Sequence, residues 1–166
     1  MKVWRLAIPF AALILVNSEA CFSDELKAGI LLKSIDHLHS LTQISKELTQ
    51  SAENITEMTG RSSCDRAWLA AQNAVHAATG GMNAVDSVVG PLLILAGMKA
   101  AEDQKLAENV VGFEINTALP VVENAIAQVN NSAATITSPS VALEVQRARD
   151  TLIKARDELK KAQSDL

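Results

Sequence analysis

The 166-residue sequence is poor in aromatic residues and in residues that interrupt helices. Phe, Trp and Tyr together make up 3% of it, with no Tyr, and there are only 4 Pro, 7 Gly and 2 Cys. So few Cys, Gly and Pro exclude a disulfide-dense scaffold, a collagen-like chain and a low-complexity chain. Hydrophobic residues make up 48% of the sequence, which is enough for one domain with a buried core.

Basic clusters are missing as well. Charged residues account for 20% of the sequence and the formal net charge is -4. Binding to a phosphate backbone requires a concentrated positive surface, which such a chain does not offer. We therefore expect no nucleic-acid partner.

The sequence contains none of the short motifs that indicate common catalytic or metal sites. It has no H-E-x-x-H, G-x-S-x-G or C-x-x-C sequence and no glycine-rich phosphate loop. His37 and His39 are two residues apart, so a helix would point them to nearly opposite faces, where they could not share a metal ion. His76 lies alone among alanines. We expect a non-enzymatic protein without a metal ion or cofactor, although a catalytic triad assembled by folding would not show in the sequence.

The first 20 residues are typical of a secretory signal peptide. Lys2 and Arg5 precede an apolar stretch at residues 6–16, and the small residues Ser18 and Ala20 follow at the positions that signal peptidase requires. The apolar stretch is about half of the roughly 20 residues that a membrane-spanning helix needs. We therefore expect cleavage after residue 20, a secreted protein and no integral membrane segment.

The mature chain, residues 21–166, has the periodicity of helices. Apolar residues recur at steps of three and four over residues 24–58, which predicts one helix there. A second helix is expected to begin after Ser62 and Ser63, with Gly80 and Gly81 either ending it or lying inside a longer helix. Gly90 and Pro91 predict a boundary, because Gly often closes a helix and Pro often occupies the first position of the next. Further helices are expected at residues 91–116, 120–130 and 138–163.

No segment shows the alternating β-branched pattern of strands. The fold that we expect is therefore a single all-α helical bundle of four to six helices.

The middle of the chain is almost uncharged. Between Arg66 and Lys99 the only charged residue is Asp86, and residues 91–98 are nearly all apolar. A helix that is apolar on all sides is either buried on all sides or faces something apolar. The middle helices are thus either the centre of the bundle or part of a surface or cavity for an apolar ligand. If they bind a ligand, we expect these residues to line the site: Trp68, Met82, Val85, Val89, Leu92, Leu95, Met98 and Phe113.

The two cysteines and two glycosylation patterns add open questions. An even number of Cys in a secreted chain favours a disulfide between Cys21 and Cys64. A straight helix over residues 24–58 would be roughly 50 Å long and would separate them, so either that helix is broken or no bridge forms within one chain. Asn54 and Asn130 each begin an N-glycosylation acceptor sequence.

Short motifs lie in the segments 31–36, 77–81, 119–122 and 139–143, with Leu38 and Leu41 following the first segment. In their order and spacing over most of residues 30–160, they resemble those of secreted fungal hydrophobic-surface-binding proteins and cell-wall galactomannoproteins. It implies an all-helical protein of the cell wall or the medium that adsorbs to hydrophobic surfaces or holds a fatty-acyl chain, without catalysis.

The function that we expect is binding of an apolar small molecule, a lipid or a hydrophobic surface outside the cell. The alternative is a secreted protein–protein interaction module, such as an adhesion protein or effector, with a filled core and no ligand. The sequence does not indicate the oligomeric state.

Overall fold

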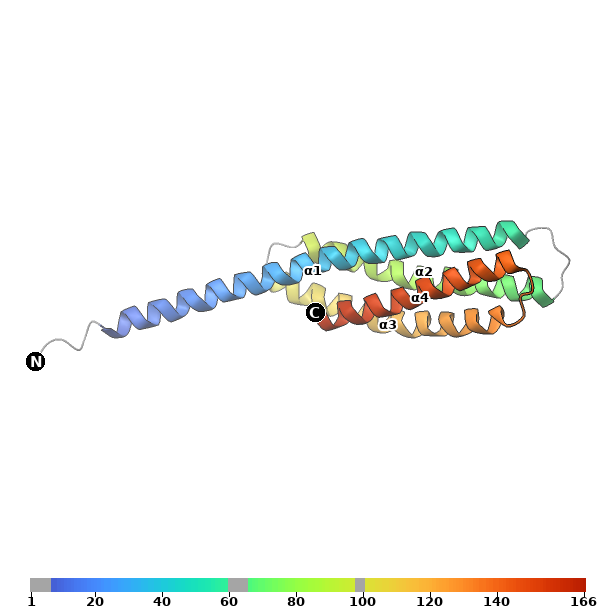
Figure 1. Ribbon diagram of the computed structural model, residues 1–166. Helices are drawn as coiled ribbons and strands as arrows, with labels where there is room; N and C mark the ends of the chain where they lie inside the picture. The colour runs from blue at the N-terminus through green and yellow to red at the C-terminus, as the bar shows by residue number, and fades with distance from the viewer. Residues whose placement is uncertain (1–6, 60–65, 98–100) are drawn as a thin grey trace, which may run out of the picture.

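The computed structural model describes the backbone of residues 7–59, 66–97 and 101–166 and the side chains of residues 29, 30, 32–59, 66–97 and 103–166 (Figure 1). The described residues form four helices and no strand, which confirms the expectation of an all-α bundle. The helices are α1 (Ala7–Thr59), α2 (Arg66–Gly97), α3 (Ala101–Ala133) and α4 (Pro139–Asp165).

Each helix runs antiparallel to the one before it (Figure 1). Neighbouring contacts are α1 with α2, α2 with α3, α3 with α4 and α4 with α1, and α2 also approaches α4 across the diagonal. The first part of α1 extends beyond the ends of the other three helices. The expected cleavage point between Ala20 and Cys21 lies within this helix, and the signal peptide stays a prediction.

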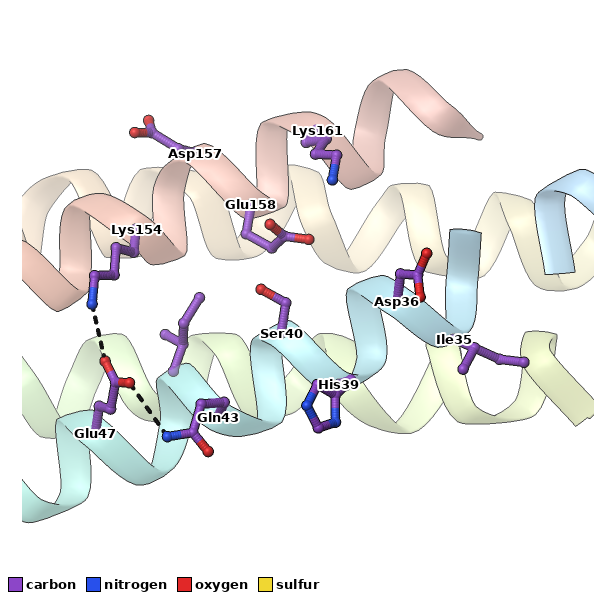
Figure 2. A pocket seen from close by; sticks show the side chains of 11 residues that line it. Ile35, Asp36, His39, Ser40, Gln43, Glu47, Lys154, Asp157, Glu158 and Lys161 are labelled. Atoms are coloured by element: carbon purple, nitrogen blue, oxygen red, sulfur yellow. Dashed lines mark hydrogen bonds and ion pairs between the residues drawn. The ribbon is translucent and has the colours of Figure 1, made fainter. Parts of the chain in front are cut away.

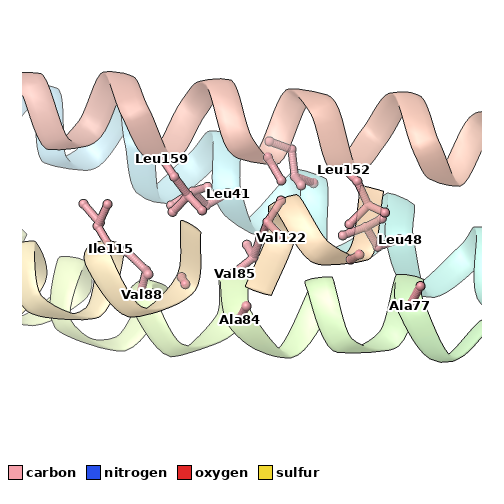
Figure 3. Close-up of a cluster of buried hydrophobic side chains, with 14 of the residues drawn as sticks. Leu41, Leu48, Ala77, Ala84, Val85, Val88, Ile115, Val122, Leu152 and Leu159 are labelled. Atoms are coloured by element: carbon pink, nitrogen blue, oxygen red, sulfur yellow. The ribbon is translucent and has the colours of Figure 1, made fainter. Parts of the chain in front are cut away.

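The core combines large side chains on α1 and α4 with small ones on α2. Leu41 and Leu48 of α1 and Leu152 and Leu159 of α4 are fully buried in one cluster (Figure 3). They pack with a stripe of buried residues on α2 whose first members are all alanines: Ala70, Ala71, Ala74, Ala77, Ala78, Gly81, Ala84, Val85, Val88, Leu92 and Leu95. The small side chains of α2 allow the helices to lie close together, so the core needs few aromatic residues.

The expected helix boundary at Gly90 and Pro91 is wrong. Helix α2 continues through Gly80, Gly81, Gly90 and Pro91, and α3 likewise continues through Pro120. A proline inside a helix costs about 3 kcal/mol because it removes one backbone hydrogen bond and its ring crowds the preceding turn. On α2 this cost is offset by four buried side chains on one stripe, two before and two after Pro91, each worth roughly 1.5–3 kcal/mol. Those four are Val85, Val88, Leu92 and Leu95.

The last expected helix agrees with the structure. Ser138 has the extended backbone of an N-cap residue, and Pro139 occupies the first turn of α4. The helix ends at Asp165, two residues beyond the expected end. The question of a Cys21–Cys64 disulfide falls outside the described residues, because Cys64 is not among them and no side chain is described for Cys21.

Candidate functional site

The residues expected to line a ligand site do not surround one cavity. Val85, Leu92 and Leu95 are at most 1% exposed and belong to the bundle core, and Met82 and Val89 are half-buried against it. These five lie along the inner side of α2, where side chains of the other helices pack against them.

The other three expected residues lie apart from this group. Trp68 is half-buried near the start of α2, whereas the Phe113 side chain is 67% exposed on α3. Met98 falls outside the described residues. Among the seven of these residues whose side chains are described, Phe113 is therefore the one that presents a large apolar surface to solvent.

A groove of about 810 Å³ runs along the surface between α1 and α4 (Figure 2). It is open to solvent, and Ile35 and Ile44 supply its apolar part. Charged side chains of both signs line the rest: Asp36, Glu47, Lys154, Asp157, Glu158 and Lys161. Lys154 Nζ lies 3.3 Å from Glu47 Oε2, which closes part of the groove with an ion pair. A lining with so many charges does not suit an acyl chain.

A buried histidine joins α1 to the end of α4 beside this groove. His37 is 3% exposed, and its Nδ1 lies 2.7 Å from Glu158 Oε1 while its Nε2 lies 3.1 Å from Asp165 Oδ2. Each ring nitrogen of His37 thus faces one carboxylate of α4. Lys33 Nζ donates to Asp165 Oδ1 at 2.7 Å, and this hydrogen bond, assisted by His37, holds the pKa of Asp165 below its usual range.

His37 and His39 lie on different sides of α1, as the sequence predicts, because His37 is buried and His39 is exposed. The part of the chain that the structure describes contains no group of three His, Cys, Asp or Glu residues suited to a metal ion. The two carboxylates sit on opposite sides of the His37 ring, an arrangement that ties two helices together. The sequence offered no signal for this cluster, because Lys33 and His37 are more than 120 residues away from their partners.

The two expected glycosylation positions differ in their surroundings. Asn54 is half-buried between α1 and α4, and its Nδ2 donates to Glu144 Oε2 at 3.1 Å. Glu144 is 4% exposed and also pairs with Arg147. Asn130 is exposed near the end of α3. The nitrogen that would carry a glycan is thus engaged in the folded protein at Asn54.

An uncharged stripe follows the flank of α2 that lies beside α3. Leu69 and Asn73 of α2 share a surface groove with Gln128 and Asn131 of α3, which shows that these flanks face the same side. From Leu69 the stripe advances in alternating steps of four and three residues, so it stays on one face of the helix. Every member is exposed except Gly80, which is half-buried: Leu69, Asn73, His76, Gly80, Asn83, Ser87, Gly90, Ile94 and Gly97.

Helix α3 presents a matching stripe with larger apolar side chains. Traced back from Asn131 and Gln128, its exposed members are Asn124, Val121, Thr117, Phe113, Val110 and Leu106. We call the two stripes together the α2–α3 outer face. Exposed charged residues continue the stripes at their ends, Arg66 before Leu69 and Asp103 before Leu106. Between these ends the face carries no Asp, Glu, Lys or Arg, and it contains six of the eleven large apolar side chains that are exposed among the described residues.

Both hydroxyl groups on this face have partners within their own helices. Ser87 Oγ donates to the carbonyl oxygen of Ala84 at 2.9 Å, and Thr117 Oγ1 donates to that of Phe113 at 3.0 Å. These two side chains consequently do not require water or a polar ligand. The other polar side chains of the face are Asn73, His76, Asn83, Asn124, Gln128 and Asn131. Four of them, Asn73, Asn124, Gln128 and Asn131, lie toward the end away from Ile94, Leu106 and Phe113.

The opposite side of the bundle is charged. Helix α4 exposes Arg147, Asp150, Lys154, Asp157, Lys160 and Lys161. The charged surface of α4 contrasts with the two uncharged stripes on α2 and α3. Away from the stripes, α2 and α3 also expose charged side chains: Arg66, Asp86, Asp103, Lys105 and Glu123.

Helix α2 also has the length and apolar composition to cross a membrane, and no other helix does within the residues that the structure describes. Only 33% of its most apolar 18-residue window is buried. Core helices of bundles commonly meet the same criterion. Here the buried part faces the core, and the exposed part contributes to the α2–α3 outer face.

Compared with protein-family models, curated proteins and solved structures, the chain matches none of them.

Proposed function

We propose that the protein is a secreted, non-catalytic helical bundle that adsorbs to hydrophobic or lipid surfaces through the α2–α3 outer face. The observation that carries the proposal is the pair of uncharged stripes on adjacent helices, with six large apolar side chains in water. Ile94, Leu106, Val110 and Phe113 lie toward one end of the face, and a cluster of exposed apolar side chains usually marks a binding site. The resemblance of residues 30–160 to secreted hydrophobic-surface-binding proteins is part of the same proposal.

The apolar side chains of the face supply the binding energy. Ile94, Leu106 and Phe113 are 60%, 67% and 67% exposed. Covering a large apolar side chain completely contributes about 1.5–3 kcal/mol, so covering the exposed part of each contributes roughly 1–2 kcal/mol. Six such side chains provide enough energy for firm adsorption without a charged anchor.

An external face agrees better with the packing than an enclosed pocket does. The inner residues Val85, Leu92 and Leu95 are already covered by other side chains. Opening a cavity among them would destabilise the folded protein by about 24 cal/mol for each Å³ of cavity. A flat apolar surface or a lipid bilayer needs no such opening.

A second candidate function is a protein–protein interaction module. The filled core favours it, because a binding partner for a filled bundle has to contact the outside. This candidate predicts no affinity for alkylated surfaces or lipid, and the adsorption experiment separates the two.

The experiment measures adsorption to an alkyl-coated sensor and to a hydroxyl-coated sensor. A double variant, Ile94→Gln with Phe113→Gln, removes two apolar side chains from the α2–α3 outer face. The matched control, Leu32→Gln with Leu143→Gln, changes two side chains of similar exposure, 65% and 55%, on α1 and α4. All four positions are exposed, so circular dichroism is expected to show unchanged helicity.

We expect the wild-type protein and the control to adsorb to the alkyl surface alike, and the double variant to bind roughly 30–150-fold more weakly, since about 2–3 kcal/mol is lost. Equal adsorption of the double variant would overturn the assignment of the face. No adsorption by the wild-type protein would reject the function and favour the interaction module.

A further inference from the structure

We infer that the α2–α3 outer face pairs with the same face of a second copy of this chain in solution, so that the protein is a dimer that separates when it adsorbs. The inference rests on the proposed function, because it concerns the same face. It names what covers this face when no apolar surface is present, namely a second copy of the chain. Pairing and adsorption can be measured independently.

The two stripes are complementary in shape. Helix α3 supplies projecting side chains at Leu106, Val110 and Phe113. Helix α2 supplies Gly90, where an added Cβ atom would meet nothing within 4 Å, as well as Gly80 and Gly97 with the same open space. Side chains that project from one helix fit over glycines of another, where the backbone can be approached closely.

A twofold axis parallel to the helices brings these stripes together. Helices α2 and α3 are antiparallel and closely connected. Gly90 lies seven residues before the end of α2 at Gly97, and Val110 lies nine residues after the start of α3 at Ala101. The two residues are therefore at about the same height along the bundle axis. Rotation by half a turn about an axis between the two helices places α3 of one copy over α2 of the other, antiparallel and at the same height. The contact then occurs twice, as symmetric dimers require.

The charge distribution selects this face over the others. The chain carries a formal net charge of -4, so two copies repel each other in general. Pairing through the α2–α3 outer face brings no Asp, Glu, Lys or Arg into contact along the stripes themselves, because Arg66 and Asp103 lie at their ends and Asp86 lies beside them. Pairing through α4 would bury several charged side chains, whose desolvation is costly.

The face is large enough for a stable dimer. The stripes from Leu69 to Gly97 and from Leu106 to Asn131 are each roughly 40 Å long, and two adjacent helices are roughly 20 Å wide. The outer face of the pair therefore covers roughly 800 Å², which equals the area of about 800 Å² per partner in a standard interface.

A dimer of this kind would regulate adsorption. In solution each copy covers the apolar face of the other, which keeps the face out of water. An alkyl or lipid surface competes with the second copy for the same residues. We therefore expect the dimer to dissociate as the protein adsorbs.

Sedimentation velocity over a range of concentrations tests the inference, with reductant present so that no disulfide can link two chains. The informative variant is Gly90→Leu. The added side chain has open space in one copy, but it fills the position that α3 of the second copy needs. It also adds apolar surface, so non-specific association would become stronger and pairing by the proposed geometry weaker. Gly29→Leu on α1, also with open space around the new side chain, is the matched control.

We expect a reversible dimer for the wild-type protein and for Gly29→Leu, and a dissociation constant raised by at least about tenfold for Gly90→Leu. A wild-type protein that stays monomeric, or a Gly90→Leu variant that dimerises as well as wild type, would overturn the inference. Monomers that still adsorb would leave the proposed function intact. Dimers that never adsorb would reject the proposed function and support the inferred dimer.

Discussion

Gly81 of α2 and Leu152 of α4 meet across the diagonal of the bundle. A Cβ atom on Gly81 would overlap Cδ2 of Leu152, and it would lie 3.7 Å from the Cβ atom of Ala125. Leu152 is fully buried, so a Cβ atom on Gly81 would have to displace its side chain within the packed core. Glycine at this position lets α2 and α4 approach closely, and it is the reason that α2 contacts all three other helices.

Neighbouring glycines are expected to respond in opposite ways to substitution. Gly81→Ala forces the added methyl group against Leu152 and is expected to destabilise the protein by about 1–3 kcal/mol. Gly80→Ala meets nothing within 4 Å and is expected to stabilise it by roughly 0.5–1 kcal/mol, since alanine favours the helix. Urea unfolding followed by circular dichroism measures both. Equal effects of the two changes would contradict the close diagonal contact.

Leu92 and Leu93 are adjacent in sequence but differ in burial, at 1% and 60% exposure. Leu92→Gln places a polar side chain in the core and is expected to cost about 3 kcal/mol or more, whereas Leu93→Gln is expected to change stability by less than about 0.5 kcal/mol. Thermal unfolding compares them. If Leu92→Gln kept its stability and lost only ligand binding, Leu92 would line a ligand site and would not be a core residue.

Pro91 lies inside α2, which predicts a gain in stability when it is replaced. Pro91→Ala restores a backbone hydrogen bond in a helix that continues on both sides, and the gain is expected to reach up to about 3 kcal/mol. Unfolding in urea measures the change. A loss of stability would instead indicate that proline starts a separate helix at this position.

The contact between Lys33 and Asp165 predicts a specific response to acid. Because the pKa of Asp165 is lowered in the folded protein, its contribution to stability is present above the unfolded pKa of about 3.9 and is lost as the pH falls through the lower folded pKa. Lys33→Met removes the largest cause of this lowering and is expected to make stability depend less steeply on pH in that range.

Urea unfolding at several acidic pH values measures this effect, with Lys46→Met, another exposed lysine of α1, as the control. An unchanged pH dependence in Lys33→Met would show that Lys33 does not stabilise the charged form of Asp165.

The sequence predicts the helices with clear periodicity better than their boundaries. The apolar steps in residues 24–58 and the alternation in α4 arise from one buried stripe each, so both helices can be recognised. Pro91 and Pro120 do not end helices as the sequence suggests, because local proline preferences are outweighed by buried side chains on both sides. That balance depends on packing with other helices, which a local pattern does not contain.

The candidate surface can be predicted only in part. Because α2 is apolar on nearly every side, its sequence does not show which side faces the core. Composition alone likewise does not distinguish the buried Val85 and Leu92 from the exposed Phe113. On α3 the signal is present: Leu106, Val110 and Phe113 form a second stripe beside the buried one at Ala107 and Val111. The His37 cluster requires the fold, since its partners come from opposite ends of the chain.

Side-chain footprinting with a photoactivated carbene tests the central claim most directly, namely that the α2–α3 outer face is the contact surface. The protein is labelled in solution and on alkyl-coated particles, and labelling is compared by mass spectrometry. We expect labelling around Ile94, Leu106 and Phe113 to decrease on the particles, while labelling around Leu143 and Lys154 on α4 stays the same. Protection of α4 with unchanged labelling around Phe113 would contradict the account.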